Sequence, residues 1–173
     1  MMKTYFSIIF AMISLNMGSI IAQDLPLLNI SLCAGPNYFY LIVTPNGSFD
    51  GIPSNIHFTI KCNSFADYLY VSPLVSFLTI EKAGPTHIVN NGSYQKFVLM
   101  GIDNLQAFNY SWAATQPDTI ANISPLDMSL TYSIQNDSWT NENNGDYYAE
   151  LNGFNRTGNI DNSCNTVIHI VHH

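Results

Sequence analysis

Positive charge is scarce in this chain of 173 residues, which holds five Lys and Arg residues against twelve Asp and Glu residues. Charged residues make up only 10% of the sequence, and the formal net charge is -7. Nucleic acids and anionic membrane surfaces attract proteins through clustered Lys and Arg side chains. We therefore expect neither a nucleic-acid partner nor an anionic membrane surface as a partner.

Long apolar runs are absent beyond the first 22 residues. Met1 to Ala22 carries one cation, Lys3, then an apolar run and a small-residue stretch. This is the layout of a secretory signal peptide, and the run is shorter than the roughly 20 residues that span a bilayer. We predict that residues 1–22 are a signal peptide, that the protein is secreted or held at the cell surface, and that no segment inserts into a membrane after cleavage. Removal leaves 173 − 22 = 151 residues with a net charge of 4 − 12 = -8, enough chain for one core.

Cysteine is also sparse, with three residues in a chain expected to meet an oxidising compartment. An odd number allows at most one internal disulfide. Cys62 continues the apolar face formed by Ile56, Phe58 and Ile60, which favours a buried thiol there. Cys33 and Cys164 then become the favoured pair, although the sequence leaves the other pairings open.

Catalytic motifs are missing as well. The sequence has no nucleophile elbow, no His-Glu-x-x-His zinc motif and no Cys-His arrangement. We expect no catalytic residue, no metal and no cofactor, and therefore no enzyme. A small secreted hydrolase stays open as a lesser alternative, in which His57 or His87 would meet an acid from another strand.

Short alternating segments separated by Gly, Pro and Asn turns fill the rest of the chain. Asn55–Cys62 is the clearest, because apolar and polar residues alternate along it as in a half-buried antiparallel strand. Further strands are predicted at residues 27–33, 38–44, 77–82, 87–89, 94–102, 128–134 and 147–151. About eight strands predict an all-β antiparallel sandwich over residues 23–160, with residues 161–173 as an edge strand or tail. Residues 64–75 are the only segment that could hold a helical turn.

Asn and Asp are concentrated between residues 136 and 146. Their oxygens could bind a hard cation, but the spacing is not that of an EF-hand, so we expect a structural loop. Asp137 would cap or turn this loop, and the Trp139 ring would pack against it. The other structural residues that we expect are Gly145, Arg156 and Gly158.

Tyrosine is abundant, which suits strands and also sugar binding. Tyr147 and Tyr148 point to opposite faces of one predicted strand, so one of the two rings should reach solvent. Together with Asn143 they are the candidate ligand-binding residues of a carbohydrate-binding module.

Several ordered motifs carry a family resemblance. They are Thr44-Pro-Asn-Gly47, Ser54-Asn-Ile-His-Phe-Thr-Ile60, Asn136-Asp-Ser-Trp139, Asn143-Asn-Gly-Asp-Tyr-Tyr148, Leu151-Asn-Gly153 and Arg156-Thr-Gly158. In this order they resemble the N-terminal module of secreted and cell-surface proteins of Bacteroidota, which is often associated with type IX secretion.

The resemblance implies an immunoglobulin-like or cohesin-like sandwich that has no assigned catalytic activity. It further implies a role in adhesion or protein interaction at the cell surface, with a surface protein or a polysaccharide as partner. Members of the family usually carry further domains, so this chain is expected to be either a standalone secreted domain or a truncated fragment of a larger surface protein.

Overall fold

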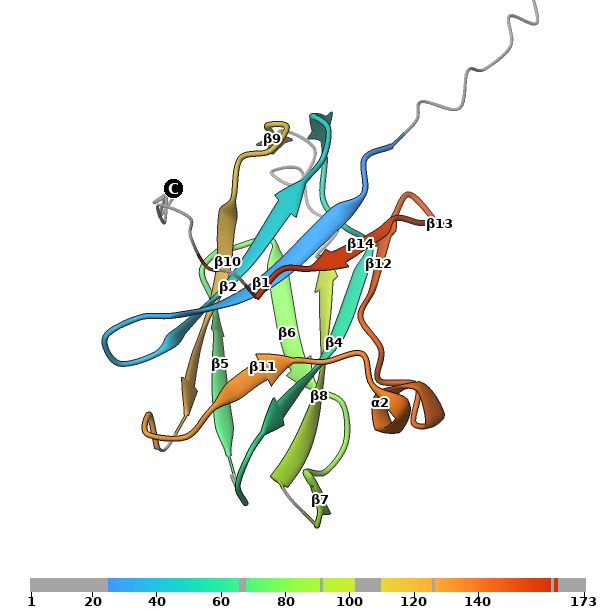
Figure 1. The fold of residues 1–173 in the computed structure, drawn as a ribbon. Coiled ribbons are helices and arrows are strands. Elements are labelled where there is room, and N and C mark those ends of the chain that lie inside the picture. Colours follow the sequence, from blue (N-terminus) through green and yellow to red (C-terminus); the bar gives the residue numbers. More distant parts are fainter. Residues whose placement is uncertain are drawn as a thin grey trace, which may run out of the picture.

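Two β-sheets packed face to face form the body of the protein in a computed structural model (Figure 1). The structure describes residues 25–65, 68–90, 92–101, 110–125, 127–162 and 164. The predicted signal peptide, residues 1–22, and most of the predicted terminal segment, residues 161–173, lie outside these ranges. The described residues confirm the predicted all-β antiparallel sandwich. No helix among them has the length and apolar composition needed to cross a bilayer.

The smaller of the two main sheets has five strands in the order β14-β1-β2-β10-β5. Their bounds are β1 Leu28–Ala34, β2 Phe39–Pro45, β5 Leu69–Pro73, β10 Asp118–Pro125 and β14 Thr157–Ile160. Neighbouring strands run antiparallel except β1 and β14, which are parallel.

The larger sheet has seven strands and is built around β4 and β8. Its order is β13-β12-β4-β8-β6, with β11 also paired to β4 and β7 also paired to β8. Their bounds are β4 Asn55–Cys62, β6 Leu78–Lys82, β7 His87–Val89, β8 Gly92–Gly101, β11 Tyr132–Ile134, β12 Tyr148–Leu151 and β13 Phe154–Asn155. A separate two-stranded ribbon joins β3 Phe49–Asp50 to β9 Ser111–Trp112.

Strand β4 alternates between the core and the outer face as predicted. Ile56, Phe58, Ile60 and Cys62 are each at most 2% exposed, and the Cys62 thiol is free. On the opposite face Thr59 is also buried, because its hydroxyl donates a 2.6 Å hydrogen bond to the carbonyl of Gly145 in a loop that covers it. The outer face of the larger sheet is therefore partly covered, and not fully open to solvent.

Strand β10 is a central strand that the sequence pattern did not predict. Its register with β2 shifts between Thr119 and Ala121, and this bulge places Ile120 and Ala121 both at 0% exposure. A bulge breaks the two-residue period on which strand prediction depends. Fourteen strand segments are present in the described residues, against the eight or so expected, partly because five of them are only two or three residues long.

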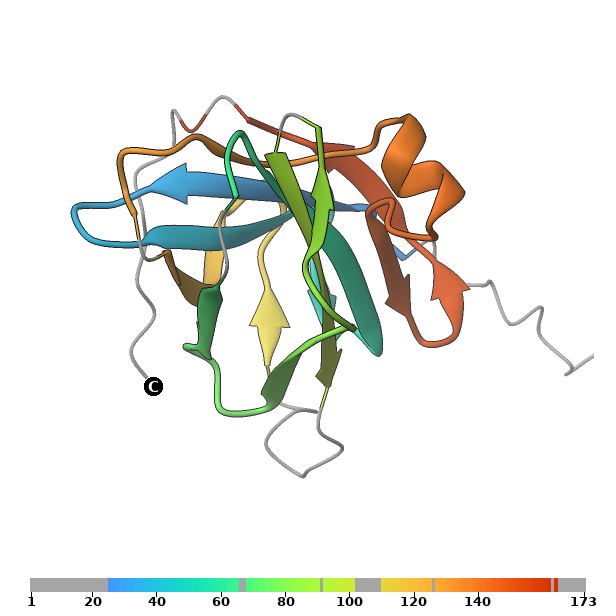
Figure 2. The same cartoon turned by 90° about the horizontal axis from the view of Figure 1, so that it is seen from below.

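Residues 64–75, which the sequence singled out as able to hold a helical turn, form a strand and no helix in the part that the structure describes. That segment contains β5, where Leu69 is buried and Val71 packs against the core, as alternation in a strand requires. The only helix in the described part of the chain is α2, Ser138–Glu142, at one side of the molecule in Figures 1 and 2.

The first and last described strands, β1 and β14, pair with each other at one edge of the smaller sheet. Cys33 at the end of β1 forms a disulfide with Cys164, the pair that the sequence favours, across a separation of 131 residues. The backbone of Arg156 also links the last strands to the first. Its amide donates to the carbonyl of Ala149, and its carbonyl accepts from the amide of Leu28. Gly158 lies so close to Leu28 and Asn29 that an added Cβ would collide with both.

We predict that Gly158→Ala lowers the free energy of unfolding by about 1–3 kcal/mol, because the new methyl group pushes β14 away from the backbone of β1. Asn159→Ala on the same strand is the control, since Asn159 is exposed and its recorded hydrogen bond uses only its backbone. That change should stay within about 0.5 kcal/mol. Urea denaturation of both variants measures the difference, and equal values would contradict the close approach.

Candidate functional site

Residues 136–148 form a corner that lies against the outer face of the larger sheet. We call this segment the corner loop. Asp137 is the N-cap of α2: its carboxylate accepts from the amide of Thr140 at 3.1 Å, and its own amide donates to the Thr140 hydroxyl at 2.7 Å. Thr140 also donates to Asp146 at 2.5 Å. This reciprocal capping holds a five-residue helix that would be too short to persist alone.

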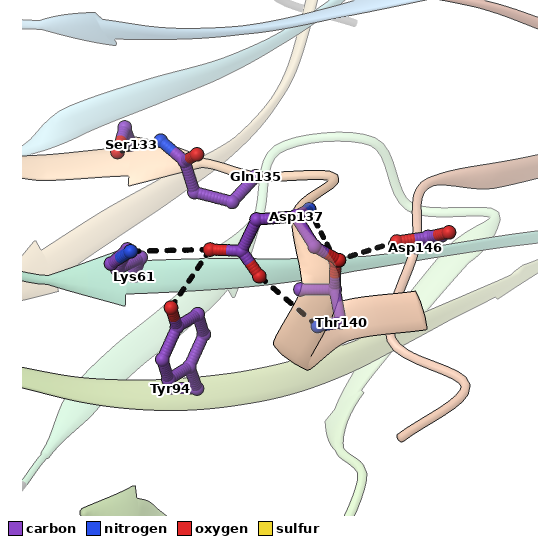
Figure 3. A network of polar contacts seen from close by, with 7 residues as sticks. All are labelled: Lys61, Tyr94, Ser133, Gln135, Asp137, Thr140 and Asp146. Carbon is purple, nitrogen blue, oxygen red and sulfur yellow. Dashed lines mark hydrogen bonds and ion pairs between the residues drawn. The ribbon is translucent and has the colours of Figure 1, made fainter. Parts of the chain in front are cut away.

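The same carboxylate ties the corner loop to the sheet (Figure 3). One oxygen of Asp137 accepts from the Lys61 ammonium at 3.1 Å and from the Tyr94 hydroxyl at 2.8 Å. Lys61 and Tyr94 are paired across β4 and β8, and the Lys61 nitrogen lies 5.0 Å from the centre of the Tyr94 ring. One side chain therefore fixes the position of α2 over two strands.

Burial alone would raise the pKa of Asp137. Hydrogen bonds from the Tyr94 hydroxyl and the Thr140 amide, and the Lys61 ammonium, outweigh it and hold the pKa below its ordinary value. The carboxylate is ionised at neutral pH with three donors on it. It is thus a structural anchor, poorly suited to take a proton from a substrate.

Trp139 covers the end of this network. Its ring stacks on Tyr94 with centroids 4.2 Å apart, and the ring of His87, the cross-strand partner of Tyr94, lies 5.3 Å from it. The indole ring covers the Tyr94 ring, which is only 4% exposed. The structural roles predicted for Asp137 and Trp139 match these contacts.

Asn143 and Gly145 are both tied to the larger sheet by hydrogen bonds to their backbone carbonyls. The side-chain amide of Asn143 donates to the carbonyl of Trp139 at 2.8 Å, and its backbone carbonyl accepts from Lys96 at 3.1 Å. A Cβ at Gly145 would come within 2.6 Å of the Thr59 hydroxyl, so glycine is needed for this approach. Asn143 thus closes the loop, and its predicted role in ligand binding stays a prediction.

Tyr147 was predicted to bind a ligand, and the structure shows that it cannot do so directly. Its ring is 3% exposed, and its hydroxyl donates a 2.6 Å hydrogen bond to the carbonyl of Leu28 in β1. This bond connects the two main sheets, and burial raises the pKa of the phenol. Tyr148 has the opposite orientation: it is half-buried on the outer face, beside the His57 ring at 4.9 Å and hydrogen-bonded to Glu150 at 3.0 Å.

Three exposed aromatic rings lie elsewhere, close to the start of β5. Phe65, Tyr68 and Tyr70 are 64%, 53% and 59% exposed and occur within six residues of sequence. Tyr70 projects from the outer face of the smaller sheet, opposite Ser124. The sequence offered no signal to single out these rings, since exposure depends on which strand ends a sheet.

The histidines do not form an acid-base pair within the described residues. His57 lies beside Tyr148 and Lys96, whereas His87 lies beside Trp139. Neither makes a hydrogen bond or ion pair with a carboxylate in the described part of the chain. No group of three or more His, Cys, Asp or Glu residues suited to a metal ion occurs there either.

The sequence matches no known family model, and no curated protein or solved structure matches the chain. The resemblance to the Bacteroidota module therefore stays a prediction.

We predict that Asp137→Ala lowers the free energy of unfolding by about 1–3 kcal/mol, because it removes the cap, the ion pair and the Tyr94 acceptor together. Asp137→Asn should cost less, because the amide oxygen still caps α2.

The contribution of Asp137 to stability should also depend on pH. The pKa of Asp137 is depressed in the folded state, so this contribution is complete above the ordinary pKa of 3.8 and is lost as the pH falls through the folded pKa. Urea denaturation at neutral and acidic pH should show the gap between wild type and Asp137→Asn closing in acid. A gap that does not change with pH would be evidence against the ion pair.

We predict that Tyr147→Phe destabilises the protein by about 1–2 kcal/mol, since it removes a buried hydrogen bond between the sheets and leaves the ring in place. Tyr148→Phe is the matched control, because that hydroxyl bonds to Glu150 near the surface. Thermal unfolding measures both. A Tyr147→Phe variant with wild-type stability would show that the phenol is not needed to join the sheets.

Proposed function

We propose that this protein is a secreted, non-catalytic binding module that recruits an extended polypeptide segment along the open edge of β5. The observation that carries the proposal is the position of β5 at the end of the five-stranded sheet, where it has a hydrogen-bonded neighbour on one side only among the described strands. Edge strands of this kind bind peptides as an additional strand. The module would serve adhesion or protein interaction at a cell surface.

The pairing of β5 with β10 determines which residues of β5 bond to β10 and which direct their backbone groups to the open edge. The amide of Leu74 donates to the carbonyl of Ile120, and the register places Pro73 opposite Ala121. Because bonded and non-bonded pairs alternate in an antiparallel ladder, Tyr70 and Ser72 also bond to β10. Leu69 and Val71 then direct their amides and carbonyls to the open edge.

The edge lacks the charged side chains by which many proteins block strand addition, although it is short and ends in a proline. β5 contains no charged residue, and only Pro73 at its end lacks an amide. Proline at this position interrupts nothing in the existing ladder, since Pro73 belongs to a non-bonded pair. An incoming strand would therefore find two donors, at Leu69 and Val71, beside the exposed rings of Tyr68 and Tyr70.

Secretion and the family resemblance belong to the same proposal. A disulfide between Cys33 and Cys164 is typical of proteins that fold in an oxidising compartment, which supports a place outside the cytosol. The immunoglobulin-like or cohesin-like type of the sandwich is supported by its two facing antiparallel sheets. Neither His57 nor His87 bonds to a carboxylate in the part of the chain that the structure describes, which supports a binding role over hydrolysis.

A carbohydrate-binding module is the second candidate, and one observation favours it. The three exposed rings of Phe65, Tyr68 and Tyr70 could stack on sugar faces. The surface differs from the one predicted at Tyr147 and Tyr148, because Tyr147 is buried. Retardation by polysaccharides in native gels, lost in Tyr70→Ala but kept in the edge variants below, would identify this function.

We predict that Val71→Pro weakens binding of an extended peptide at least about tenfold, because the proline removes an open-edge amide and its ring obstructs the incoming strand. Val71→Ala is the matched control: it loses the same core contact of the side chain but keeps the amide. The probe is a peptide selected from a displayed library of random extended peptides, titrated by fluorescence against each variant. Circular dichroism must first show that both variants are folded. Equal affinities for the two variants would refute strand addition at β5.

A further inference from the structure

A shallow hollow lies on the outer face of the larger sheet, beside the corner loop and away from the open edge of β5. Strands β4 and β8 form its floor, while Ala83, Asn144 and Gly145 form part of its rim. Two groups able to carry positive charge line it, His57 from β4 and Lys96 from β8. In a protein with a net charge of -7, two such groups lining one hollow make it a candidate site for an anion.

A hydrogen bond holds the Lys96 side chain in place, but no carboxylate in the described residues pairs with its charge. Its ammonium donates to the carbonyl of Asn143 at 3.1 Å, and it makes no ion pair with a carboxylate in the described residues. An ammonium group has three donors, so two are left for a ligand. The bond to Asn143 holds the side chain against the hollow without cancelling its charge.

His57 has unused hydrogen-bonding capacity at the same place. Its ring packs against Tyr148 with centroids 4.9 Å apart, and neither ring nitrogen has a hydrogen-bond partner within the described part of the chain. Burial, and to a lesser degree the nearby Lys96 charge, lowers the pKa of His57 below its ordinary value. Without a ligand the imidazole is therefore neutral at neutral pH.

The acids that face this region are engaged or turned to solvent. Glu150, on β12, accepts from both Tyr148 and Ser54, at 3.0 Å and 2.9 Å. Glu81, on β6 opposite Val98, is exposed. Neither bonds to His57 or Lys96, so both cationic partners are available to an anion from outside.

We propose that this hollow binds a carboxylate group, with one oxygen on the Lys96 ammonium and the other on the protonated His57 ring. A carboxylate offers two acceptor oxygens and one charge, which suits one ammonium and one imidazolium. Val98 and Ala83 give the carbon skeleton of the ligand an apolar contact.

The test follows the His57 ring by NMR while the pH is varied, with the purified protein in sodium acetate or in sodium chloride of equal ionic strength. Bound acetate stabilises the protonated ring, so the pKa of His57 should rise in acetate. A rise of about one unit means that the protonated form binds acetate about ten times more tightly than the neutral form. The His87 ring, which packs on Trp139 outside the hollow, is the internal reference, and its signals should not distinguish the two salts.

Variants of Lys96 separate specific binding from a general salt effect. Lys96→Gln should abolish the difference between acetate and chloride, whereas Lys96→Arg, which keeps the charge, should retain part of it. Val71→Pro should leave the difference unchanged, because the hollow is independent of the proposed peptide edge. No difference in the wild-type protein, or a difference that persists in Lys96→Gln, would overturn the proposal.

Two further probes identify the source of the carboxylate. Glucuronate that binds more tightly than acetate would assign the hollow to a sugar acid, and equal binding would assign it to simple carboxylates. Glucose, which has the ring but no carboxylate, should not move the His57 signals. If glucose shifts them as strongly as glucuronate, the carboxylate is not what is recognised and the proposal fails.

Discussion

Strand β4 must satisfy two different environments at once, and the rest of the structure depends on this constraint. Its inner face supplies Ile56, Phe58 and Ile60 to the core between the sheets. Its outer face anchors the corner loop through Lys61 and Thr59. Since β4 also pairs with β8, β11 and β12, a shift of one residue would invert both faces and detach the loop.

The corner loop shows how a polar segment becomes part of the fold. Asp137 caps a helix that is too short to form alone, and the same carboxylate receives Lys61 and Tyr94 from two strands. Its cap, ion pair and acceptor roles reinforce one another because each fixes the carboxylate for the others. An Asx-rich loop of this kind resembles a cation site in composition, yet the carboxylate oxygens of Asp137 and Asp146 accept hydrogen bonds within the fold.

Local patterns predicted the parts of this molecule that depend on neighbouring residues. The alternation of Asn55–Cys62, the buried thiol at Cys62 and a turn or cap at Asp137 all follow from side chains close in sequence. Strand β10 escaped prediction because its bulge breaks the alternation between Thr119 and Ala121. The partners of Asp137 escaped for another reason, since Lys61 lies 76 residues away and nothing in a single sequence connects the two. The exposed edge at β5 likewise exists only once the order of strands is known.

The parallel pairing of β1 with β14 determines how the domain would respond to mechanical load. A pull that separates the start of β1 from the end of β14 acts along the two strands, so their hydrogen bonds are loaded together in shear and not broken one after another. The disulfide between Cys33 and Cys164, 131 positions apart in sequence, then prevents the chain between them from extending even if these bonds fail. A module built in this way would resist unfolding when force is applied across its ends.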